Sequence, residues 1–159
     1  MISTLFGFAL SALLAQDPQA GSAQEAMAAL EAHAVEFART HAGHARLGDG
    51  SPLPVATEED RRLFAVPPAL ESQTVRRGFL TGQLEFCEAG GIDLSYMPYM
   101  QRLRASGRYS DRQMAYLGVL HGVSQQMAMS AMEETRFTCT DDFRAELRAA
   151  TDEFPVLTP

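Results

Sequence analysis

Residues 110–135 read SDRQMAYLGVLHGVSQQMAMSAMEET and carry the strongest local signal in the chain, a helix start. Ser110 and Gln113 have the spacing of a capping box, in which each side chain bonds the backbone N–H of the other residue. Tyr109 and Met114 flank this box as a hydrophobic staple. The pattern predicts a helix that runs to about Thr135, roughly 26 residues or 39 Å at 1.5 Å per residue. That length suits the axis of a small domain.

The segments on both sides of this helix also have helical patterns. Apolar residues recur at three- and four-residue steps from Ala23 to about Gly43, and residues 43–54 follow as a glycine- and proline-rich loop that is predicted to be mobile. No stretch alternates convincingly between apolar and polar residues, so no sheet is expected. The sequence predicts an all-α bundle of four to six helices. Further helices are expected over residues 57–65 behind an N-cap at Thr57, over 69–89, over 93–107, and from caps at 138–141 to Pro155.

The short helix over 93–107 has two specific features. Asp93 or Ser95 is its expected cap, and proline is tolerated in its first turn. Met97, Met100 and Leu103 are expected to face the core.

The composition fits one domain, expected over residues 23–154. The chain has 159 residues, of which 46% are hydrophobic, so neither a disordered tail nor a multi-domain assembly is indicated. Acids outnumber bases by 20 to 13, and the net charge is −7. This charge argues against nucleic acid and acidic lipid as partners.

The N-terminus is predicted to be a cleavable signal peptide, residues 1–15. An apolar run, LFGFALSALLA, spans residues 5–15 and would extend roughly 16 Å as a helix, about half of a ~30 Å hydrocarbon core. A transmembrane anchor is therefore not expected. Cleavage is expected after Ala15, or alternatively after Ser22 or Ala23, although no Lys or Arg precedes the run. We expect a periplasmic or secreted protein; the alternative is a buried amphipathic N-terminal helix.

Two cysteines, Cys87 and Cys139, are predicted to form one disulfide in an oxidising compartment. The bond would close a loop of about 50 residues and stabilise the fold by about 4 kcal/mol on the chain-entropy estimate. The two sulfurs can meet if the helices over 69–89 and 110–135 run in the same direction, with the short helix returning between them.

Each of these two long helices has a pair of glycines that is a candidate contact position. Gly78 with Gly82, and Gly118 with Gly122, have the Gly-x-x-x-Gly spacing that allows backbones to approach closely. The pairs lie at different distances from the cysteines, so they are not expected to pack on each other, and one could receive the first helix or another protein. His121 lies between the second pair and is either a ligand residue or a hydrogen-bonded core histidine.

Histidines and methionines provide two candidate metal sites. His41 and His44 have an i, i+3 spacing that can share one zinc or copper ion, and His33 precedes them on the same helix. Met129 and Met132 could share a helix face, and thioethers suit Cu(I). The structural alternatives are solvated histidines near a helix end and methionines that fill the core. No other cofactor is predicted.

The sequence contains no GxGxxG, GxxxxGK[ST], GxSxG, HExxH or CxxCH motif, so the chain is not predicted to be an enzyme. By elimination, it is predicted to be an exported interaction, adaptor or accessory module whose partner is another exported or envelope protein. The contact surface is expected on the long helix and on the helix over 23–43. The alternative function is a periplasmic metal-handling protein that uses the histidines or methionines above.

Overall fold

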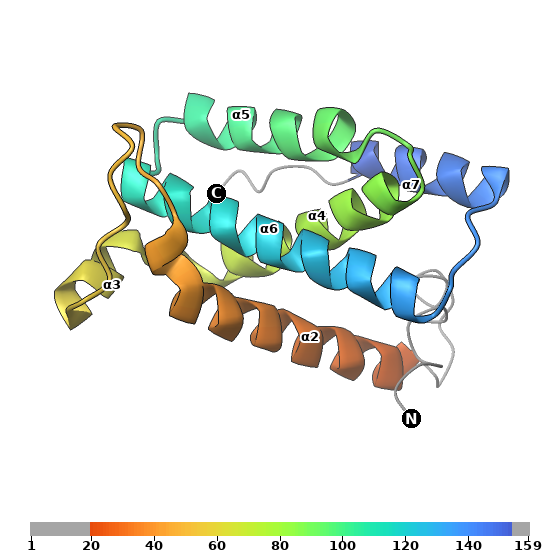
Figure 1. The fold of residues 1–159 in the computed structure, drawn as a ribbon, viewed down its shortest axis with the longest axis horizontal. Helices are drawn as coiled ribbons and strands as arrows, with labels where there is room; N and C mark the ends of the chain where they lie inside the picture. The colour runs from red at the N-terminus through yellow and green to blue at the C-terminus, as the bar shows by residue number, and fades with distance from the viewer. Residues whose placement is uncertain (1–19, 154–159) are drawn as a thin grey trace.

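The computed structural model describes residues 20–153, which form six α-helices and no β-strand (Figure 1). The predicted all-α fold is confirmed over this range. The predicted signal peptide, residues 1–15, lies outside the described residues. The helices are α2 (Ala20–His41), α3 (Glu58–Phe64), α4 (Pro68–Phe86), α5 (Met97–Ala105), α6 (Asp111–Glu134) and α7 (Asp141–Glu153), with two short helical turns, η2 (Ala42–His44) and η3 (Ile92–Tyr96).

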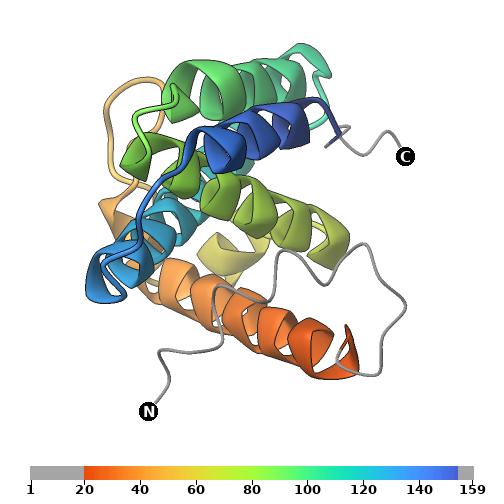
Figure 2. The same ribbon diagram turned by 90° about the vertical axis from the view of Figure 1, so that its right-hand side faces the viewer.

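The long helices form three layers (Figure 1 and Figure 2). α4 and α6 occupy the middle layer, and both run from left to right in Figure 1, the common direction that the sequence predicted. α2 lies on one side of them, and α5 and α7 lie on the other. α5 runs back in the opposite direction, but in the outer layer rather than between the two. None of the helices between residues 20 and 153 has the length and apolar character needed to cross a bilayer.

Capping boxes start two helices where the sequence predicts helix starts. Ser110 Oγ accepts the Gln113 N–H at 3.3 Å, and Gln113 Oε1 accepts the Ser110 N–H at 3.0 Å. Thr57 and Asp60 make the same reciprocal pair at the start of α3. α2 begins earlier than predicted, at Ala20, so cleavage after residue 22 or 23 would remove its first turn.

The region before α5 differs from the prediction. Asp93 and Ser95 do not cap a helix, because both lie inside η3, a π-helical turn that begins directly after Gly91. The wider turn changes which side chains face the core. Met97 is 43% exposed, contrary to prediction, and Tyr99 takes the buried position instead. Its hydroxyl oxygen lies 2.6 Å from the hydroxyl of Thr74, which makes burial of this polar group tolerable.

The loop over residues 43–54 has defined anchors. Leu53 is buried, and its N–H donates to the carbonyl of Ala45 at 3.0 Å. The Leu47 N–H donates to the Ser51 carbonyl at 2.8 Å. These bonds close the loop at its base, and its predicted mobility stays a prediction.

Glycines permit a very close contact between α4 and α6. A Cβ atom on Gly78 would stand 2.6 Å from the backbone oxygen of His121, and one on Gly82 would overlap the backbone oxygen of Gln125. At both positions, a residue with a side chain would fit only if one of the two helices moved. As the unequal spacing from the cysteines predicted, Gly78 and Gly82 do not pack on Gly118 and Gly122.

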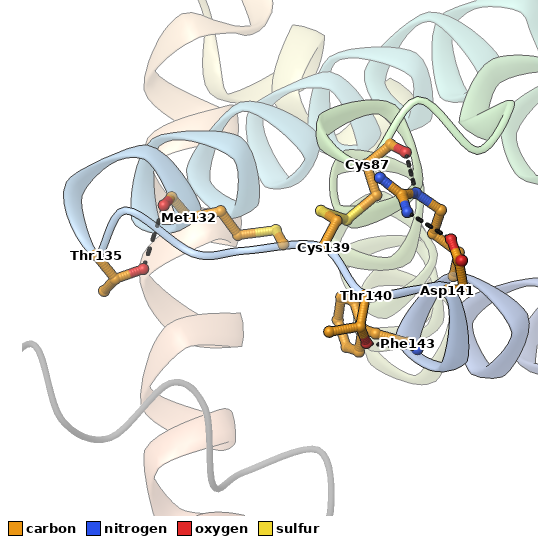
Figure 3. Close-up of a disulfide and its surroundings, with 8 residues drawn as sticks. Cys87, Met132, Thr135, Cys139, Thr140, Asp141 and Phe143 are labelled. Carbon is orange, nitrogen blue, oxygen red and sulfur yellow. Dashed lines mark hydrogen bonds and ion pairs between the residues drawn. A yellow bond between two sulfur atoms is a disulfide. The ribbon is translucent and has the colours of Figure 1, made fainter.

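The predicted disulfide joins the end of α4 to the segment before α7 (Figure 3). Cys87 is the C-cap of α4, and its Cα lies 5.6 Å from that of Cys139, 52 residues further along the chain. Arg144 Nε donates to the Cys87 carbonyl at 3.0 Å, which ties α7 to the same point. The bond is enclosed by a small apolar cluster that includes Leu84, Met132 and Leu147.

Substitution of Gly82 tests the α4–α6 contact. We expect Gly82→Ala to lower the free energy of unfolding by about 1–3 kcal/mol, because the methyl group forces the helices apart. Gly122→Ala is the matched control: no heavy atom lies within 4 Å of a Cβ at this position. The control should gain about 0.5–1 kcal/mol from the helix preference of alanine. Urea unfolding followed by circular dichroism measures both, and equal stabilities would contradict this packing.

Candidate functional site

A buried polar centre lies where α4, α6 and η3 meet. The Thr81 hydroxyl oxygen is 3.0 Å from His121 Nε2, 2.8 Å from Ser95 Oγ and 2.9 Å from the carbonyl oxygen of Arg77. Thr81, Ser95 and His121 are almost fully buried. The Tyr96 ring packs against the imidazole with the ring centroids 4.6 Å apart. The space beside His121 is therefore occupied by the protein's own side chains.

His121 is held as a neutral imidazole. Burial lowers its pKa from 6.5 to about 4, and the positive charge of Arg77 acts in the same direction. The side chain is 1% exposed and lines neither of the two cavities described below. Of its two predicted roles, the hydrogen-bonded core histidine matches this environment.

A second polar centre, which the sequence analysis missed, joins α2, α4 and α6 through buried Glu71 and Tyr116 and the exposed Arg39. Arg39 NH2 lies 3.0 Å from both carboxylate oxygens of Glu71, and the Tyr116 hydroxyl donates to Glu71 at 2.7 Å. Glu71 is only 6% exposed. Burial raises the pKa of Tyr116, and its bond to the Glu71 carboxylate raises it further. A cavity of about 240 Å³ beside this centre is also lined by Arg61 and Arg62.

The larger cavity is an open groove of about 570 Å³ between α2 and α6. The side chains along it are mostly apolar, and the Phe37 ring on one wall is 43% exposed. Gly122 lies on the other wall with open space above its Cα. We call this cavity the α2–α6 groove; it is lined by Leu30, His33, Phe37, Gly122, Val123, Gln126, Met127, Ser130, Ala131 and Glu134.

The second glycine pair has two different environments. Gly118 has the Tyr96 hydroxyl oxygen 3.9 Å from its Cβ position, whereas Gly122 has no such neighbour. The groove lies on α2 and α6, the two helices on which the sequence predicted the contact surface. The spacing of apolar residues along each helix did not predict a cavity between them.

The candidate metal residues are not gathered in one place. His33 lies in the groove, eight residues or about 12 Å of helix rise before His41. His41 stacks on Phe37 at 3.9 Å, its Nδ1 is 2.8 Å from the Phe37 carbonyl oxygen, and its ring centroid is 6.0 Å from that of His44.

The methionine candidates also have different surroundings. Met132 is buried in the cluster around the disulfide, whereas Met129 is half-buried. Among residues 20–153, no group of three or more His, Cys, Asp or Glu side chains is placed to hold a metal ion. The metal-handling alternative stays a prediction.

Acid should destabilise the fold through His121. The unfolded chain takes up a proton near pH 6.5 and the folded chain only near pH 4. The stability that the neutral imidazole contributes is therefore complete above about pH 6.5, and about 3 kcal/mol of it is lost as the pH falls from there to the pKa of the folded imidazole, about 4. His121→Gln retains a hydrogen-bonding side chain but does not titrate, so it should lose less stability over this range. Chemical denaturation of both proteins at about pH 7 and about pH 4 measures the difference. Equal losses in the two proteins would exclude this role of His121.

Comparison of the chain with protein-family models, curated proteins and solved structures found no match.

Proposed function

We propose that this chain is an exported, non-enzymatic interaction module that receives a segment of another exported or envelope protein in the α2–α6 groove. The observation that carries the proposal is the groove itself, an open concavity with mostly apolar walls and an exposed aromatic ring. Concave apolar sites of this kind are where binding energy concentrates in protein interfaces, and aromatic side chains are frequent anchors there.

The available apolar surface supports a binding role. Phe37, Met127 and Val123 are not fully covered within the chain, and each stands to lose water contact when a partner fills the groove. At about 25 cal/mol per Å² of apolar surface removed from water, a few such side chains provide several kcal/mol before the cost of association is subtracted. Met127 adds adaptability, because its unbranched thioether can adopt several packings.

The buried polar centres support a structural rather than a catalytic interpretation. His121 and Glu71 have hydrogen-bond partners from neighbouring helices, and both are nearly inaccessible to solvent. A general acid or base must reach the substrate proton within hydrogen-bond distance. The groove offers one imidazole, His33, and one carboxylate, Glu134, as titratable groups.

Export is supported by the disulfide. Cystines persist in oxidising compartments and are rare in the reducing cytosol. The Cys87–Cys139 bond is consistent with the leader predicted for residues 1–15, and it supports our proposal that the mature protein acts in the periplasm or outside the cell.

Site-specific photocrosslinking tests the proposal. A photoreactive phenylalanine analogue replaces Gln126, exposed in the groove, or Gln101, exposed on α5 as the control. In cells that produce the protein we expect one discrete adduct from position 126 and none from position 101. Gly122→Leu fills the groove from a position with open space and should reduce the adduct by about tenfold or more. The absence of an adduct at position 126, or the same adducts from both positions, would refute the proposal.

A further inference from the structure

The two walls of the α2–α6 groove have the dimensions of a helix-binding site. On α6 the lining positions form one continuous stripe from Gly122 to Glu134, a rise of about 18 Å over 12 residues. On α2 the lining residues Leu30, His33 and Phe37 have i, i+3, i+7 spacing. Two helix faces that enclose a groove about three turns long can take a third helix of similar length.

Gly122 provides the close approach that such a helix needs. Gly78 and Gly82 show how this fold uses glycine, because α6 backbone occupies the space where their side chains would be. At Gly122 the corresponding space is open. A backbone from outside can therefore approach α6 at Gly122 in the way that α6 approaches α4.

The charge at one end of the groove indicates which charged side chain the occupant carries there. Among the ten side chains that line the groove, Glu134 is the only carboxylate, and none is an arginine. Glu134 is the last residue of α6, where the negative end of the helix dipole adds to its carboxylate. The exposed side chain of Glu133 is next to it, the exposed Arg136 lies two residues further along the chain, and the chain as a whole has a net charge of −7. A basic side chain is complementary to this end of the groove.

We infer that the occupant of the groove is one amphipathic helix of about three turns, with an apolar face toward Phe37 and Met127 and a Lys or Arg that meets Glu134. This inference rests on the proposed function and specifies its partner. A fatty acid would bring a carboxylate to an acidic site, so the charges favour the basic helix over an acyl chain.

Two labelled peptides and one lipid provide the test. The first peptide is an amphipathic helix of about 14 residues with Leu on one face and Lys on the other, and the second has Glu in place of Lys. The third probe is a fluorescent fatty acid. Binding to the full chain is measured by fluorescence anisotropy in physiological salt, with helix formation of the peptide followed by circular dichroism. We expect the Leu/Lys peptide to bind at least about tenfold more tightly than the Leu/Glu peptide.

Variants separate local complementarity from bulk charge. Glu134→Lys should weaken Leu/Lys binding by about threefold or more, whereas Glu146→Lys, the same charge change at an exposed position of α7, should change it by less than about twofold. Gly122→Leu should weaken binding by about tenfold. Equal effects of the two charge changes, equal affinity for both peptides, or displacement of the peptide by the fatty acid would overturn the inference.

The two proposals fail in different ways. If the Leu/Lys peptide does not bind while the adduct at position 126 forms and is lost in Gly122→Leu, the groove is an interface and the basic helix is the wrong occupant. If that adduct is also absent, the proposed function is wrong.

Discussion

Two glycines set the distance between α4 and α6, because a Cβ at Gly78 or Gly82 would collide with a backbone oxygen of α6. At this distance the Thr81 hydroxyl reaches the imidazole of His121, so these two buried polar groups are partners for each other. The contact also assigns the two faces of α6. One face of α6 packs against α4, and the face that carries Gly122 forms a wall of the α2–α6 groove. Packing in the core thus determines which surface is available for binding.

The disulfide and the Glu71 centre hold this arrangement from its two ends. The cystine ties the end of α4 to the segment that follows α6, at about 4 kcal/mol, a large share of the ~5–15 kcal/mol stability of an ordinary domain. At the other end, Glu71 joins Arg39 of α2 to Tyr116 of α6. Both walls of the groove are therefore linked to α4, and a site that is held in place in the free protein has a lower entropic cost of binding.

The features that the sequence predicted correctly depend either on neighbouring residues or on a pairing that had no alternative. The capping box at Ser110 depends on residues three apart, and the Cys87–Cys139 pair was the single connectivity available. The features that it missed depend on side chains from different helices. Glu71 alone suggests a solvated face until Arg39 is seen across from it, and the burial of Tyr99 required a π-helical turn that no spacing rule indicates. The groove depends on how α2 meets α6, which a single helix pattern does not contain.

The central claim is that the mature chain functions outside the cytoplasm. There the Cys87–Cys139 disulfide joins the end of α4 to the segment before α7. The most direct test is the intact mass of the native protein recovered from the cell envelope or medium, after alkylation without reduction. The account predicts a chain that begins after residue 15 and carries no alkyl group, and that accepts two alkyl groups once it is reduced. A cytosolic protein that retains residues 1–15 and is alkylated at both Cys87 and Cys139 without reduction would contradict it.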